Sequence, residues 1–166
     1  MAHHAHMADV RAHGERRIDV AAHHIYRVLA DFNSLHPRIL PAAFSAFRVE
    51  TGGVGAGTVI AYRLRVGGRS REARARVDEP EPGRVLTETD LARSLVTTFT
   101  VDPDGDGCRV QIDTHWRDAG GVGGWLERTF APRVLGRLYA DELDRLETVA
   151  SEVAALAIAP EVTESL

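Results

Sequence analysis

The chain has 166 residues, a net charge of −4 and a pI of about 6.0. This length suits one domain, and the acidic balance argues against a protein whose partner is nucleic acid. Cys108 is the only cysteine, which excludes an intramolecular disulfide and a zinc site built on cysteines. No apolar run reaches the roughly 20 residues of a membrane-spanning helix. We therefore expect a cytoplasmic protein that is a monomer or a homodimer.

The two ends of the chain are expected to lie outside the fold. Residues 1–8 begin Met1-Ala2-His3-His4-Ala5-His6-Met7, which resembles a histidine tag followed by a second start methionine. This segment lacks the apolar core of a signal peptide. We place the domain at residues 9–157 and expect residues 158–166 to be a flexible tail.

The first predicted elements are a strand over residues 10–20 and a short helix over residues 21–30. In the helix, Ile25, Val28 and Leu29 recur at helical spacing. The next segment is interrupted by prolines and predicts a second brief helix around Ser34. From Phe44 on, apolar residues alternate with a period of two, which is typical of strands. The predicted strands cover residues 44–51, 58–66, 69–78, 84–89, 94–101 and 108–117.

The period returns to that of a helix after Asp118. We predict a flexible, glycine-rich entry at residues 120–124 and a helix over about 125–157, which Pro132 should kink or restart. A helix this long needs an apolar surface to lie on. Strands joined by short turns, with helices only near the ends, indicate an α+β fold. We expect a curved antiparallel sheet of about seven strands around the long C-terminal helix, with two short helices after the first strand.

Several stretches carry a resemblance to a known superfamily. They are Ile18-Asp19-Val20-Ala21-Ala22 with Val28-Leu29-Ala30-Asp31-Phe32 and His36-Pro37, the turn Gly53-Val54-Gly55-Ala56-Gly57-Thr58 with Tyr62, and the helix from Trp125-Leu126 to Leu146. Residues 10–150 resemble the START-like (SRPBCC) superfamily of helix-grip proteins, and within it the bacterial polyketide cyclase/dehydrase-like branch. The resemblance implies a cavity between sheet and helix that binds lipids, polyketides, hormones or quinones. Some members are enzymes, and the fold alone does not choose among these functions.

The candidate ligand site lies on the inner face of the predicted sheet. Tyr62 and Leu64 are large, whereas Ala75 on the next strand is small and leaves room opposite the helix. Arg71 shares the parity of Ala75, so we expect it to point inward and to need an anionic partner or a ligand carboxylate or enolate. His36 lies in the loop that borders the cavity in the resembling fold. The predicted ligand-binding residues are His36, Tyr62, Leu64, Arg71, Ala75, Phe99, Phe130 and Leu138.

We predict no metal site and no cofactor. The run from Asp102 to Gly107 with Asp113 nearly matches the ligand spacing of an EF-hand loop. Its flanks are strand-like, however, and Asp and Gly are also the residues that hairpin turns select. The glycines of residues 52–57 are not followed by a helix, which argues against a phosphate-binding loop.

Three function hypotheses follow. The first is binding of a small hydrophobic ligand (a lipid, a polyketide or another aromatic or isoprenoid compound) between sheet and helix. The second is an enzyme of the polyketide aromatase/cyclase type, in which Arg71 and Tyr62 polarise carbonyls and move protons. The third is a protein-interaction module. The sequence leaves open the ligand, the catalytic residues and whether a reaction is catalysed.

Overall fold

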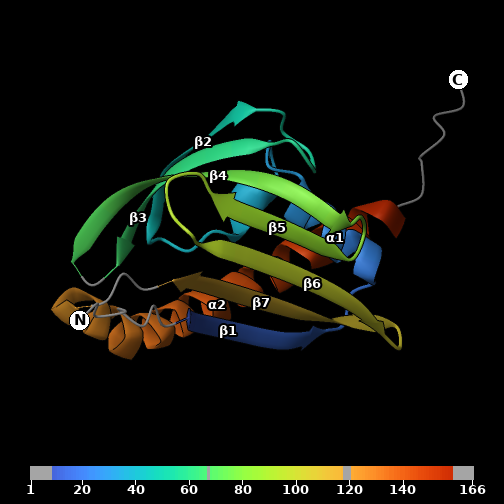
Figure 1. Ribbon diagram of the computed structural model, residues 1–166. Coiled ribbons are helices and arrows are strands. Elements are labelled where there is room, and N and C mark those ends of the chain that lie inside the picture. The colour runs from blue at the N-terminus through green and yellow to red at the C-terminus, as the bar shows by residue number, and fades with distance from the viewer. Residues whose placement is uncertain (1–8, 67, 118–120, 159–166) are drawn as a thin grey trace, which may run out of the picture.

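Seven antiparallel strands form one curved sheet in the computed structural model, which describes residues 9–66, 68–117 and 121–158, and only the backbone of residues 121–130. The strand order is β1-β7-β6-β5-β4-β3-β2, so β2 to β7 are a meander and β1 joins it beside β7. The predicted α+β helix-grip architecture is confirmed (Figure 1). The strands are β1 (Asp9–Ile18), β2 (Phe44–Thr51), β3 (Val59–Val66), β4 (Arg69–Glu81), β5 (Val85–Asp90), β6 (Val96–Asp104) and β7 (Gly107–Arg117).

Two strands extend beyond their predicted ends, and each includes a proline in the additional residues. β4 runs through Pro80 to Glu81, and β6 runs through Pro103 to Asp104. Proline cannot donate to a strand ladder, so it is tolerated at irregularities and strand ends. Pro80 lies within a register shift of the β4–β5 ladder, between the pairs Asp78–Thr87 and Glu81–Val85. Pro103 pairs with Cys108 next to the β6–β7 turn.

The segment after β1 contains one α-helix and one 3-10 turn. In α1 (Ala22–Ala30), Ile25, Val28 and Leu29 are buried as predicted. The second short helix was expected around Ser34, but the structure has a 3-10 turn, η1 (His36–Ile39), in its place. The Asp31 carboxylate accepts hydrogen bonds from the following backbone amides and folds that stretch into a turn. Pro37 suits the start of η1 because the first N–H groups of a helix have no partner to lose.

The long helix α2 (Gly121–Ile158) is continuous from a start earlier than predicted. Residues 121–124 were expected to be a flexible entry, but they belong to the helix; residue 120 lies outside the described residues. Pro132 was expected to kink or restart the helix, but α2 continues through it without a break. None of the described helices combines the length and apolar character needed to cross a membrane.

α2 packs mainly against β1, α1 and η1, and Leu143, Leu146 and Val149 bring its apolar side into the core. The helix lies close to β1 at Gly14, where an added Cβ would be 2.7 Å from the Cβ of Tyr139. Figure 1 shows α2 alongside β1 and β7, while β2, β3 and β4 form the far side of the sheet. One edge of the sheet therefore holds the helix, and the other curves away from it.

Candidate functional site

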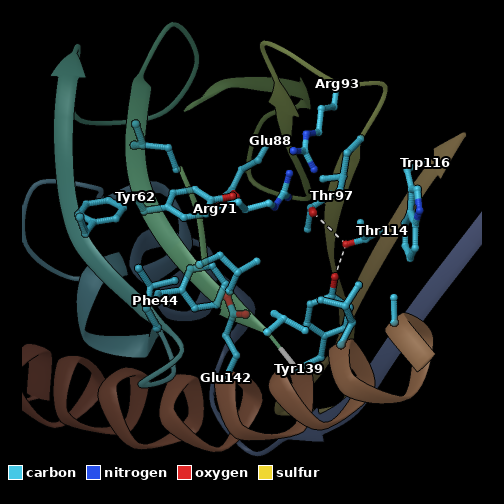
Figure 2. Close-up of a pocket in the computed structure, with 18 of the residues that line it drawn as sticks. Phe44, Tyr62, Arg71, Glu88, Arg93, Thr97, Thr114, Trp116, Tyr139 and Glu142 are labelled. Carbon is cyan, nitrogen blue, oxygen red and sulfur yellow. Dashed lines mark hydrogen bonds between the residues drawn. The ribbon is translucent and has the colours of Figure 1, made fainter. Parts of the chain in front are cut away.

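A cavity of about 720 Å³ lies between the inner face of the sheet and α2. Its apolar wall contains four aromatic side chains, Phe44, Phe47, Phe99 and Trp116, and the helix contributes Ala131 and Leu135. The polar lining residues are His36, Tyr62, Arg69, Ser70, Arg71, Glu88, Arg93, Ser94, Thr97, Thr114, Arg117, Tyr139 and Glu142. Figure 2 shows side chains from the sheet and from α2 facing one another across this space. Although polar residues are numerous, the surface of the cavity is mostly apolar, which is the common form of a small-molecule site.

The structure brings five of the eight predicted site residues together on this wall. They are His36, Tyr62, Leu64, Arg71 and Phe99. The side chain of Phe130 lies outside the described residues.

Two predicted wall residues do not line the cavity. Ala75 is only 3% exposed and belongs to the core; its methyl group is short, and its cross-strand neighbour Ile60 reaches the wall instead. Leu138 packs against the core. Helical spacing places Leu138 at the edge of the face that carries Leu135 and Glu142, where its side chain is packed against the core and does not reach the cavity.

His36 is buried at the inner wall and has a defined tautomer. Its Nδ1 is 2.7 Å from the carbonyl oxygen of Leu29, which can only accept, so Nδ1 carries the proton. The ring stacks on Phe32, with the centroids 4.3 Å apart. Burial lowers the pKa of His36 to about 4, against the opposing effect of the bond to Leu29. His36 is therefore neutral near pH 7, and Nε2 is left as a hydrogen-bond acceptor.

Glu88 points inward from β5 beside His36. Its Oε1 is buried, has no hydrogen-bond partner among the described residues and lies 3.5 Å from Nε2 of His36. Burial raises the pKa of the Glu88 carboxyl to about 7. Two acceptors facing each other repel, so the protonated form of Glu88, which can direct its O–H at Nε2, suits this site.

A second buried carboxyl, Glu142, enters from the helix. It lines the cavity and is 4% exposed, within a helical stripe that also contains Tyr139 and Leu146. Burial raises the pKa of Glu142 well above its ordinary value, and repulsion from Glu88 and Asp141 raises it further. The inner part of the cavity therefore has two carboxyl groups that both favour the neutral form.

Three hydroxyl groups form a chain across the cavity wall. The Tyr139 hydroxyl is hydrogen-bonded to Thr114 Oγ1, which is 2.8 Å from Thr97 Oγ1 (Figure 2). Burial raises the pKa of the Tyr139 hydroxyl, so it stays protonated. These hydrogen bonds fix the orientation of the Tyr139 side chain and join α2 to β6 and β7.

Arg71 has an anionic partner within the protein. Its guanidinium lies 3.6 Å from the Asp90 carboxylate, which is largely buried. Asp90 Oδ1 also accepts hydrogen bonds from the amides of Ala92 and Arg93, so it holds the β5–β6 turn. Asp90 is thus the anionic partner that was expected for an inward Arg71, and Arg71 does not require a ligand anion.

The cavity opens to solvent at one end of the sheet. Its exposed lining residues are Arg69 and Ser70 at the start of β4, Arg93 and Ser94 in the β5–β6 turn, and Arg117 at the end of β7. These residues define the mouth of the cavity.

Sequence reasoning missed the carboxyl and hydroxyl groups of the cavity, although the pattern could have found several of them. Leu86 is buried, and the alternation of β5 places Glu88 and Asp90 on the same face. Thr114 and Trp116 share the inner face of β7. Tyr139, Glu142, Leu146 and Val149 follow helical spacing, but a glutamate in such a stripe is normally assigned to solvent.

The acidic turn that nearly matches an EF-hand loop is part of the β6–β7 hairpin. Asp102 lies in β6, where it accepts a hydrogen bond from Arg84, and Asp113 lies far along β7, paired with Thr98. Within the described ranges, no three His, Cys, Asp or Glu residues are grouped to hold a metal ion.

Comparisons with known proteins agree with this architecture. The family model described as polyketide cyclase / dehydrase and lipid transport matches residues 9–151. The chain is 34% identical to the KanY protein, whose solution structure it matches with a TM-score of 0.77 over 87% of this chain and 99% of that one. No curated protein matches the chain significantly.

Two more distant structures share the fold. The Zhui aromatase/cyclase from Streptomyces sp. R1128 is 15% identical, with a TM-score of 0.71 over 92% of this chain and 100% of that one. Norcoclaurine synthase from Thalictrum flavum, in complex with dopamine and hydroxybenzaldehyde, is 19% identical, with a TM-score of 0.64 over 88% of each chain. The family match and the similarity to KanY together show that the chain belongs to the polyketide cyclase/dehydrase and lipid transport family, a START-like branch.

Proposed function

We propose that this protein binds a small, largely apolar molecule in the cavity between the sheet and α2. The observation that carries the proposal is the cavity itself, which has a volume of about 720 Å³, is open at one end and has a mainly apolar surface. Ligand sites commonly have volumes of about 300–1,000 Å³. The relevant wall residues include the predicted His36, Tyr62, Leu64, Arg71 and Phe99.

The chemistry of the wall favours a ligand with a flat, aromatic part. The ring centroids of Phe44 and Tyr62 are 5.3 Å apart and the two rings are tilted relative to each other, and Trp116 of β7 also lines the cavity. Aromatic faces contribute both apolar area and a preferred stacking geometry. Two proteins with this fold, an aromatase/cyclase and a norcoclaurine synthase, act on or bind ring compounds by their names and complexes. An aromatic or polyketide-like compound therefore suits this cavity better than a saturated chain.

Native mass spectrometry of protein purified without detergent tests this proposal. We expect one small molecule per chain, released on denaturation, and its fragmentation identifies the compound class. The ligand-free protein should also take up one equivalent of an added naphthalene derivative. A protein that carries no adduct and takes up no aromatic compound would show that the cavity is not a binding site.

A second function, catalysis of an aromatase/cyclase-type reaction, is favoured by one further observation. The cavity combines buried carboxyl groups whose pKa values are raised, Glu88 and Glu142, with the Arg71 guanidinium. Such perturbed groups in one cavity are typical of active sites. The reaction would cyclise a polyketone chain with loss of water, and mass spectrometry of a short poly-β-ketone thioester would detect the dehydrated product. An Arg71→Ala variant with undiminished product formation would remove Arg71 from the reaction.

A further inference from the structure

Three arginines from separate parts of the sheet converge on the mouth of the cavity. Arg69 begins β4, Arg93 lies in the β5–β6 turn and Arg117 ends β7, and all three are exposed while also lining the cavity. Figure 2 shows Arg93 reaching from its turn toward the same part of the cavity as Arg71. The mouth therefore has a high density of positive charge on a chain whose net charge is −4.

Among the described residues, the acids close to the mouth do not neutralise this charge. Asp90 pairs with Arg71, and in the described part of the chain none of the three mouth arginines has an acidic partner within ion-pair distance. On the outer face of the same sheet, by contrast, Arg63 pairs with Glu72. Guanidinium groups bind carboxylates and phosphates through paired N–H donors, so an unneutralised cluster of them at an opening favours an anion.

The inner cavity has the opposite preference. Glu88 and Glu142 face it from β5 and α2, and the lone pair of His36 Nε2 lies beside Glu88. An anion placed there would lose its water among apolar side chains such as Phe99 and Leu135 and would face the lone pair of His36 Nε2, and burial of a charge in such surroundings is costly. A negative charge on the ligand is consequently stabilised at the mouth and destabilised inside.

We propose that the ligand is an anionic amphiphile, with its apolar body inside the cavity and a carboxylate or phosphate group held at the mouth by Arg69, Arg93 and Arg117. This inference rests on the proposed function, because it assigns the charge and the orientation of the molecule that the cavity binds. It makes the three arginines the residues that determine specificity.

A matched pair of ligands tests the charge requirement. The probes are 4-(2-naphthyl)butanoate and its neutral amide, 4-(2-naphthyl)butanamide, titrated by calorimetry at pH 7 in low salt. We expect the carboxylate to bind about tenfold more tightly, since hydrogen bonds to charged groups typically have an effect of this size. The preference should shrink at 0.5 M salt, at which the screening length is only a few ångströms. A naphthylethyl phosphate then distinguishes phosphate from carboxylate as the favoured head group.

Two variants of equal charge test the location. The mouth variant combines Arg69→Gln, Arg93→Gln and Arg117→Gln, and it should bind the carboxylate and the amide with affinities that differ by less than about twofold. The control variant combines Arg11→Gln, Arg27→Gln and Arg137→Gln, which are exposed positions away from the cavity wall. We expect the control to keep the tenfold preference.

Each outcome decides between the two proposals. Equal affinities of the wild type for carboxylate and amide, or a preference that persists in the mouth variant, would overturn the anionic amphiphile while leaving the cavity as a binding site. Unchanged amide binding in the mouth variant shows that its cavity is intact. Failure of all the probes to bind the wild type would overturn the proposed function, and this inference with it.

Discussion

Replacement of Gly14 by alanine should force the long helix away from the sheet. The new methyl carbon would lie 2.7 Å from the Cβ of Tyr139, whereas carbon atoms pack best at about 3.5–4.0 Å. The strand and the helix must therefore separate by about 1 Å. Overpacking of this kind typically costs about 1–3 kcal/mol. The backbone of Gly14 is outside the left-handed region, so the strand itself accepts alanine, and the loss comes from the contact with α2.

The assay compares the thermal and urea unfolding of Gly14→Ala with that of a control variant, in which a glycine of α2 is replaced instead. A loss of about 1–3 kcal/mol corresponds to roughly 2–12 °C in Tm for a domain of this size. Gly136 in α2 is the control, because a Cβ added there meets nothing within 4 Å. Gly136→Ala should stabilise the protein by up to about 1 kcal/mol, since alanine is the better helix former. If Gly14→Ala were as stable as the wild type, the close approach of α2 to β1 would be wrong.

Three further predictions concern the polar groups of the cavity. The pKa of Glu88 rises from 4.5 to about 7 on folding. The protonated carboxyl therefore makes its full contribution to the stability of the fold below pH 4.5, and this contribution is lost as the pH rises through 7. The free energy of unfolding of Glu88→Gln, measured with urea, should therefore increase relative to that of the wild type by up to about 3 kcal/mol between pH 4.5 and pH 8. A difference between the two proteins that does not depend on pH would contradict this. Nitrogen NMR should find His36 neutral and protonated on Nδ1 from pH 8 to pH 5, because its pKa is lowered to about 4; a midpoint near 6.5 would oppose its burial. Thr114→Val leaves the buried Tyr139 hydroxyl without its partner and should cost about 1–3 kcal/mol, a loss that should be smaller when Tyr139 is already Phe.

The periodic spacing of apolar residues along the sequence was sufficient to predict the fold. Alternation placed Tyr62 and Leu64 on the inner face of β3, and the return of helical spacing predicted α2. Alternation gives the face of a strand but not the depth that a side chain reaches. For that reason Ala75, which is on the predicted face, proved to be core rather than cavity wall.

The polar interior was not predictable in the same way. A glutamate at an inward position is assigned to solvent by default, because the cost of burying a charge argues against it. Glu88 and Glu142 escape that cost by favouring the neutral form, which depends on neighbours that only the folded chain brings together. The convergence of Arg69, Arg93 and Arg117 likewise depends on the curvature of the sheet, because they are far apart in the sequence.

The central claim is that an apolar molecule occupies the cavity, and a cavity-blocking variant tests it most directly. Ala131 lies on the cavity wall, and Ala140 is exposed on the same helix. The measurement is a fluorescence titration with the neutral dye N-phenyl-1-naphthylamine on the wild type, Ala131→Phe and Ala140→Phe. We predict one dye molecule per chain for the wild type and Ala140→Phe, and at least tenfold weaker binding for an Ala131→Phe variant of unchanged Tm. Equal affinity in all three proteins would place the dye elsewhere and contradict the account.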